Sequence, residues 1–371
     1  MKFTIDKSEF LKTLQRMQGI VERRNTMPIL SNVLMEANNG RVDITATDLE
    51  VFIKDSTQAD VSENGSITVN ARKLFDIIKE MKEKPEETIS VVAGKDDRVT
   101  IKLGKARFTV MGLPAKDFPA FPTYEEKSFD DIDGPVFKEM IDKTAFAVST
   151  DETRYNINGF KLERERSKLR LVTTDGHRLA YIERGDEKGS KKGEKIDVLV
   201  PRKGMMEFKR LLDEAGDEYK ISITQKSAIM KKDNTIINIR LLEGEFPDYS
   251  KVIPKDNDKD ILINKEAFLS SLKSVSIISP DKIKGVKMLF GDGKLVISSS
   301  SPDIGEAVEE IDSDYKGEEL EVAFNARYFI DALEAMEEET IMIRLKDSLS
   351  PGILQPAGRQ DYTYIVMPMR L

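Results

Sequence analysis

The chain has no cysteine among its 371 residues, and this absence excludes disulfides, thiolate catalysis and cysteine metal sites. It also lacks an apolar run long enough to cross a bilayer. Residues 1–6 begin directly with the alternating pattern of a strand, where a secreted protein would carry the apolar segment of a signal peptide. We therefore expect a soluble, cytoplasmic protein that has no membrane partner.

Motifs for catalysis and phosphate binding are also scarce. The chain contains neither a GxxxxGK[ST] loop nor a GxGxxG turn between a strand and a helix. Its only histidine, His177, follows Asp175 by two residues, and the two side chains could form an acid/base pair with Thr174 nearby. Gly176 favours a corner between them, so a structural or binding role for His177 is the better interpretation. We predict no catalytic residue, no metal site and no cofactor.

The charge of the chain is negative overall but unevenly distributed. A net charge of −8 argues mildly against nucleic acid as a partner, because nucleic-acid-binding domains are usually basic. The predicted helices nevertheless carry many cations: Lys12, Arg16, Arg72, Lys73, Lys79, Lys138, Lys143, Arg202, Lys203, Lys209, Arg210, Lys265, Lys273 and Arg327. Either these cations form a segregated basic surface, or they belong to ordinary solvated helix faces on which acidic residues are interleaved. The sequence leaves both interpretations open.

A long internal repeat organises the chain. Residues 156–183 show a strand, a tight turn, a strand, a polar corner and a third strand, and the same outline recurs at residues 31–56 and 285–311. The corners lie at residues 46–48, 173–175 and 299–301, which are 127 and 126 residues apart. A second landmark, an arginine that opens a predicted helix, recurs at Arg72, Arg202 and Arg327 with spacings of 130 and 125 residues. Two landmarks with one period predict three homologous domains.

Each predicted domain reads as two consecutive βαβββ units, which is an α+β fold. A helix after residue 6 carries the apolar stripe Phe10, Leu11, Leu14, Met17 and Val21, and further helices are predicted near residues 71–82, 135–147, 202–213, 265–276 and 326–338. Asn38-Asn39-Gly40 predicts a tight hairpin. Proline-rich segments at 112–122 and 242–254 read as linkers, so we place the domains at residues 1–123, 124–254 and 255–371.

The end of the chain is unusually apolar. Ile365, Val366, Met367 and Met369 stand where a free terminus would normally be polar. Either this segment completes a sheet edge, or it lines a surface pocket, for which the flexible thioether of methionine is well suited.

Five motifs together resemble a known family. They are ATDLE at residues 46–50, TTDGHRLA at 173–180, VPRKG at 200–204, FPDY at 246–249 and VMPMRL at 366–371. In this order they resemble the bacterial DNA polymerase III β subunit, the sliding clamp family. The resemblance implies a DNA-clamp fold in a head-to-tail ring dimer, with helices lining the hole. It implies a non-enzymatic processivity factor that encircles duplex DNA without reading its sequence.

The resemblance also implies partners and contact residues. The expected partners are the α subunit of the replicative DNA polymerase, the ATP-dependent clamp loader, and other polymerases and repair proteins that carry clamp-binding peptides. The residues expected to face DNA are Arg24, Arg72, Lys73, Arg202 and Lys203. At the ring seam, Phe108 and Val110 would meet Ile277 and Ile278 of the partner subunit. The expected peptide pocket consists of Ile157, Thr174, Gly176, His177, Arg178, Leu179, Pro247, Val252, Met367, Pro368, Met369 and Arg370.

Overall fold

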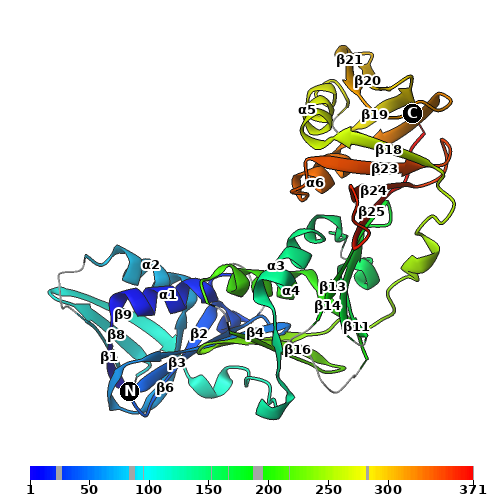
Figure 1. Cartoon of the computed structure of the whole chain (residues 1–371). Coiled ribbons are helices and arrows are strands. Elements are labelled where there is room, and N and C mark those ends of the chain that lie inside the picture. Colours follow the sequence, from blue (N-terminus) through cyan, green and yellow to red (C-terminus); the bar gives the residue numbers. More distant parts are fainter. Residues whose placement is uncertain are drawn as a thin grey trace. The chain divides into compact units, whose positions relative to one another are not determined.

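The computed structural model describes residues 1–21, 27–82, 88–94, 96–151, 153–165, 167–186, 195–216, 218–280 and 284–370 (Figure 1). The chain forms two compact units. The first contains residues 1–134 and 206–241, and the second contains residues 135–205 and 242–371. No helix within the described ranges is both long and apolar enough to cross a bilayer.

The first unit is built on one antiparallel sheet with two helices, α1 (Lys7–Met17) and α2 (Ala71–Glu80). Its strands are β1 (Lys2–Ile5), β2 (Asn32–Asn38), β3 (Arg41–Thr47), β4 (Val51–Gln58), β5 (Asp60–Glu63), β6 (Gly65–Asn70), β7 (Ile89–Ala93), β8 (Arg98–Leu103), β9 (Ala106–Leu113), β10 (Asp130–Ile132), β15 (Tyr219–Ile223), β16 (Ser227–Lys232) and β17 (Thr235–Arg240). Their spatial order is β10-β15-β16-β17-β4-β3-β2-β6-β9-β8-β7-β1-β5.

The second unit contains two antiparallel sheets. Its helices are α3 (Gly134–Asp142), α5 (Lys265–Val275) and α6 (Ala326–Glu334), and α4 (Arg202–Asp213) starts in this unit. The strands are β11 (Gly159–Glu165), β12 (Lys168–Thr174), β13 (Arg178–Gly185), β14 (Ile196–Pro201), β18 (Lys259–Asn264), β19 (Gly285–Gly291), β20 (Lys294–Ser301), β21 (Gly305–Asp312), β22 (Leu320–Asn325), β23 (Thr340–Leu345), β24 (Gly352–Pro356) and β25 (Tyr362–Val366). The sheet orders are β14-β11-β12-β13-β25-β24-β23-β18 and β21-β20-β19-β22.

The order of elements confirms the predicted repeat. β1-α1-β2-β3-β4 is followed by β6-α2-β7-β8-β9, and the same βαβββ sequence recurs from β10 to β17 and from β18 to β25. The one addition in the described residues is the short strand β5, which pairs with β1. The α+β assignment is therefore confirmed.

Local signals in the sequence place several element ends. Asn39 and Gly40 both have positive φ, at 51° and 78°, as a two-residue turn of the predicted hairpin requires. Asn70 caps α2 by accepting a hydrogen bond from the Lys73 N–H at 3.0 Å, and Asn325 caps α6 from the Arg327 N–H at 2.9 Å. The asparagine in front of the repeated arginine thus starts these helices.

The helices cover one face of their sheets with apolar stripes. In the first unit α1 and α2 pack side by side on the sheet (Figure 1). Phe10, Leu14 and Met17 of the predicted stripe of α1 are fully buried, while Leu11 and Val21 are half-buried. In the second unit α5 and α6 meet through Phe268 and Phe329, whose rings lie edge to face at 5.7 Å.

The third predicted helix ends earlier than expected. α3 stops at Asp142, and residues 145–147 form a separate 3-10 turn. The Thr144 hydroxyl donates to the Met140 carbonyl at 2.7 Å, so a side chain takes the carbonyl that the next helical N–H would have used.

The apolar end of the chain does not form a sheet edge. Ile365 and Val366 are buried in β25, which pairs with β13 on one side and β24 on the other. The strand is therefore interior, and that alternative is wrong. Met367, directly after it, donates its N–H to the His177 carbonyl at 2.9 Å.

Two of the predicted basic helix residues do not contribute to a basic surface. Arg16 lies 2.5 Å from the buried carboxylate of Asp55 and also pairs with Glu214, and its side chain is only 17% exposed. Lys143, with 4% exposed, pairs with Glu139. Arg210 and Arg327 face solvent but pair along their own helices with Glu207 and Asp331. Much of the helical positive charge is therefore neutralised locally.

A charge network in the second unit joins α3, β13 and the segment before β25. Arg184 donates to Glu139 at 2.7 Å and to Asp361 at 2.6 Å, and Glu139 also accepts from Lys143 at 2.8 Å. Burial acts to raise the pKa of Glu139, but the hydrogen bonds from Arg184 and Lys143 outweigh burial and lower this pKa from 4.5 to about 2.

This lowered pKa predicts a pH-dependent contribution to stability. Because the folded pKa of Glu139 lies below its unfolded value, the contribution is fully present above about pH 5 and is lost as the pH falls toward 2. We expect Glu139→Gln to lower the urea midpoint at pH 7, and the difference from the parent to shrink between pH 5 and pH 3. Glu266→Gln is the control, because Glu266 is 75% exposed in its pair with Lys265. A difference for Glu139→Gln that stays constant with pH would contradict this account.

Candidate functional site

The second unit contains a small cavity of about 220 Å³ where three segments meet. β13 forms one side, residues 246–252 form another, and Met367 closes the third. The lining residues are Arg154, Ile157, Thr174, Gly176, Arg178, Leu179, Phe246, Pro247, Tyr249, Val252, Ile365 and Met367. Ile157, Leu179, Phe246 and Ile365 belong to the buried core, so the floor is apolar, whereas Val252 and Met367 are each 39% exposed at the rim.

The corner between β12 and β13 is held by side chains. The Thr174 hydroxyl donates to the Arg178 carbonyl at 2.6 Å and accepts from the Gly176 N–H at 3.1 Å. One oxygen of Asp175 accepts from the N–H groups of His177 and Arg178. Gly176 has φ +93°, which only glycine adopts readily. The corner is therefore a rigid edge of the cavity.

Arg178 is a fixed wall of the cavity rather than a mobile cation. Its guanidinium donates to Asp175 at 2.9 Å and to Asp331 at 2.8 Å, and it lies 4.7 Å from the centre of the Tyr328 ring. Two carboxylates thus balance its charge. Arg154, which is exposed, donates to the Asp175 carbonyl at 3.0 Å from the rim.

Asp175 and His177 do not form an acid/base pair. Both oxygens of Asp175 accept hydrogen bonds from Arg178 or from backbone N–H groups. The exposed His177 ring instead stacks against Tyr328 at 6.5 Å. The geometry therefore favours the structural interpretation of His177.

The FPDY segment is held in place by contacts of Tyr249 with β11 and β13. The Tyr249 hydroxyl donates to Glu163 of β11 at 2.7 Å, and its ring lies 6.0 Å from that of Tyr181. Burial, followed by the hydrogen bond to Glu163, raises the pKa of Tyr249, so the hydroxyl stays a donor. These contacts fix the wall that Pro247 and Val252 present to the cavity.

The structure brings most of the predicted pocket residues together. Of the predicted set, Ile157, Thr174, Gly176, Arg178, Leu179, Pro247, Val252 and Met367 line the cavity. His177, Pro368 and Met369 are not among its lining residues, and the Met369 N–H donates to the Ala323 carbonyl of β22 at 2.8 Å. Arg370 lines a different cavity near Ser298 and Ser300. Sequence reasoning missed Arg154, Phe246, Tyr249 and Ile365. Phe246 and Tyr249 belong to the FPDY motif, so the motif itself was the sequence signal that could have found them.

The predicted seam residues lie on exposed strand and helix ends. Phe108 of β9 is 41% exposed and Ile277, after α5, is 73% exposed, while Val110 and Ile278 are half-buried. Met111, Ile304 and Val308 are further exposed apolar residues at 64%, 60% and 64%, and the sequence did not single them out.

The predicted DNA-facing residues cluster at helix starts. Arg72 and Lys73 are exposed in the first turn of α2, and Arg202 is exposed at the first residue of α4. Lys203 follows it and is half-buried. Arg24 lies outside the described residues.

Comparison with known proteins identifies the family over the whole chain. Models of the DNA polymerase III beta subunit match residues 1–122 with the N-terminal domain, 131–248 with the central domain and 250–370 with the C-terminal domain. The chain belongs to the DNA polymerase III beta subunit family. The beta sliding clamp of Pseudomonas putida is 37% identical and that of Escherichia coli is 33% identical, each with 100% of both chains covered.

Solved structures of beta subunits agree with this assignment. The DNA polymerase III subunit beta of Pseudomonas aeruginosa superposes with a TM-score of 0.95 at 35% identity, and all of both chains is covered. A sliding clamp from the same organism bound to griselimycin gives a TM-score of 0.93 at 36% identity with the same coverage. Members of the beta subunit family are non-catalytic processivity factors that bind DNA and polymerase, and the chain is therefore not an enzyme.

The left-handed glycine at the corner generates a stability prediction. A Cβ on Gly176 would lie 2.8 Å from the Arg154 guanidinium, which can move, but the positive φ would remain strained. We expect Gly176→Ala to cost roughly 1–2 kcal/mol in urea unfolding. Gly185→Ala at the far end of β13 is the control, because a Cβ there meets nothing within 4 Å. Equal midpoints for the two variants would show that the corner carries no strain.

Proposed function

We propose that this chain closes as a head-to-tail dimer around duplex DNA and tethers replication proteins through the cavity beside β13. The main observation that supports this proposal is the cavity beside β13. It has a buried apolar floor, a rigid polar corner and an exposed methionine at its rim. The bacterial chromosome lies in the cytoplasm, and we place the function there.

The size of the cavity suits a peptide anchor. A volume of about 220 Å³ accommodates one or two apolar side chains, such as leucine and phenylalanine. A short extended segment would leave its remaining residues on the rim near Arg154 and Val252. We propose that the replicative polymerase α subunit, the ATP-dependent clamp loader, and other polymerases and repair proteins use this one site in turn.

Two unpaired strand edges support the proposed ring. β9 pairs with β8 along its length but with β6 only through Gly112 and Leu113, and β21 is the last strand of its sheet within the described residues. Strand edges of this kind pair readily with another chain. Phe108 and Val110 would meet Ile277 and Ile278 of the partner subunit, with Val308 beside them.

The charges on the two edges are complementary. Exposed Lys105 and Arg107 lie on or beside β9, whereas Glu306 and Glu310 are exposed on β21. Opposite charges favour a β9-to-β21 contact and disfavour contacts between two copies of the same edge. A head-to-tail arrangement follows from this complementarity.

The proposed DNA contacts are Arg72, Lys73, Arg202 and Lys203, together with Arg24. Cations in the first turn of a helix stand beside backbone N–H groups that also attract anions. Contacts of this kind bind phosphates without reading bases, which suits a ring that slides.

Peptide binding tests the tether. We expect Met367→Glu to weaken binding of a labelled peptide with leucine and phenylalanine anchors by at least about tenfold, because a charge would stand at the apolar rim. Fluorescence anisotropy measures the affinity. Leu49→Glu is the control, since Leu49 is exposed at 44% and belongs to the first unit, whereas the cavity lies in the second. Undiminished affinity in the Met367 variant would refute the pocket assignment.

Oligomeric state and retention on DNA test the ring. We expect Phe108→Asp to sediment as a 42.0 kDa monomer and to lose retention on circular DNA, because the aspartate would stand in an apolar seam. Leu49→Asp is a close control, with 44% exposure against 41% for Phe108, and should stay dimeric. A dimer in the Phe108 variant would reject this seam.

A further inference from the structure

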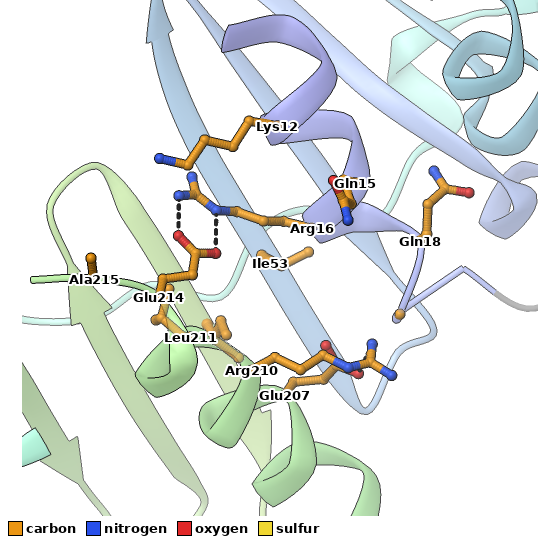
Figure 2. A pocket seen from close by; sticks show the side chains of 12 residues that line it. Lys12, Gln15, Arg16, Gln18, Ile53, Glu207, Arg210, Leu211, Glu214 and Ala215 are labelled. Atoms are coloured by element: carbon orange, nitrogen blue, oxygen red, sulfur yellow. Dashed lines mark hydrogen bonds and ion pairs between the residues drawn. The ribbon is translucent and has the colours of Figure 1, made fainter. Parts of the chain in front are cut away.

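The first unit contains a second, larger cavity of about 730 Å³ that the proposed function does not use (Figure 2). It lies between α1 on one side and residues 207–215 on the other, which form the second half of α4 and the two residues after it. The lining residues are Lys12, Gln15, Arg16, Gln18, Gly19, Ile53, Glu207, Arg210, Leu211, Glu214, Ala215 and Ile237. None of them belongs to the peptide pocket, the seam or the proposed DNA contacts.

The floor of this cavity is apolar. Ile53 of β4 and Ile237 of β17 stand directly opposite each other in the paired strands, and Leu211 of α4 lies beside them. All three belong to the buried core. The floor thus joins the N-terminal repeat to the central one.

One end of the cavity is fixed by an ion cluster. The Arg16 guanidinium donates to Glu214 at 2.8 Å, as Figure 2 shows. It also donates to Asp55 at 2.5 Å and to Thr235 at 3.0 Å. Asp55 is buried and also accepts from the Thr13 hydroxyl at 2.9 Å. Thr235 in turn donates to Asp55 at 3.1 Å, so the buried partners of Arg16 are held in place and this end of the cavity is preformed.

The other end is closed by a second ion pair. Arg210 donates to the buried carboxylate of Glu207 at 2.9 Å. A Cβ on Gly19 would lie 1.9 Å from the Arg210 guanidinium and 2.6 Å from Glu207, so the missing side chain is what lets the pair approach the end of α1. The two ion pairs leave a preformed space between them.

The three cations of the lining are matched by three carboxylates. Lys12, Arg16 and Arg210 stand against Glu207, Glu214 and the buried Asp55, which pairs with Arg16. Arg16 and Arg210 are paired, whereas Lys12 makes no hydrogen bond or salt bridge within the described part of the chain. Figure 2 places its ammonium at the mouth, on the same helix as Gln15.

We infer that this cavity binds a small aromatic anion, such as an aryl carboxylate or sulfonate. The ring would lie on Ile53, Ile237 and Leu211, and the anionic group would meet Lys12 with the Gln15 amide beside it. The volume falls in the range of small-molecule pockets. An aromatic anion uses both the apolar floor and the Lys12 ammonium, whereas a phosphate alone would use only the cation.

Titration of the full-length protein with anilinonaphthalene sulfonate, followed by fluorescence without DNA, tests this inference. We expect saturable binding that Gln15→Trp abolishes, because the exposed Gln15 position allows an indole to fill the cavity without disturbing the core. Lys12→Gln should weaken the affinity about threefold, as the loss of an exposed charge pair does. Lys79→Gln makes the same charge change on α2 and should leave the affinity unchanged.

The peptide pocket is the competing site for the probe. If Val252→Glu removes the signal while Gln15→Trp keeps it, the probe occupies the pocket beside β13 and the inference fails. The absence of saturable binding would also overturn it. Density for the probe between α1 and α4 in a crystal of the complex would establish it. Peptide binding should be unchanged in Gln15→Trp, so the inference and the proposed function fail independently.

Discussion

The fold depends on one kind of pairing, in which the last strand of one domain repeat pairs with the fourth strand of the repeat before it. In the first unit β17 pairs with β4 from Thr235 to Ile239, and in the second unit β25 pairs with β13 from Tyr362 to Val366. Each pairing merges strands from separate repeats into one continuous sheet. The peptide pocket is a direct product of this pairing, because Met367 reaches the corner at Gly176 only when β25 is bound to β13.

The same rule explains which edges remain open. A chain of three repeats uses two such pairings internally, and it leaves the last strand of the first repeat, β9, and the fourth strand of the last repeat, β21, without this partner. Exposed edges with apolar side chains favour uncontrolled association. In the ring proposed above, opposite charge on β9 and β21 would select one pairing between two copies, so the exposed edges would also set the head-to-tail direction of the assembly.

Much of the fold could be predicted because its signals are local. The Asn39-Gly40 turn, the asparagine caps and the helical stripes depend on neighbours within a few residues, and the caps and stripes occur more than once along the chain. Ion pairing could not be predicted in this way. Arg16 reads as a solvated helix cation, yet its partners Asp55 and Glu214 lie 39 and 198 residues away in the chain. The second cavity was missed for the same reason, because separate stretches of sequence contribute its lining.

The pocket residues that could be predicted are those that belong to a sequence motif and also line the cavity. TTDGHRL supplied the corner, and the chain end supplied Met367. Arg154 and Ile365 were missed because they contribute through the fold around those motifs rather than through a pattern of their own. Phe246 and Tyr249 were overlooked within FPDY because a buried aromatic reads as core until its partner, Glu163 for Tyr249, is seen.

The distribution of charge reconciles an acidic chain with a DNA partner. Glu139, Glu207 and Asp331 neutralise cations on α3, α4 and α6, whereas Arg72, Lys73 and Arg202 make no side-chain salt bridge within the described residues. The affinity for DNA rises with the number of phosphates that a protein neutralises, and so does its salt dependence. If Arg72, Lys73 and Arg202 face DNA as proposed, these few unpaired cations would give weak, sequence-independent attraction. Weak attraction is sufficient when a closed ring provides retention by topology, and it leaves the protein free to move along the duplex.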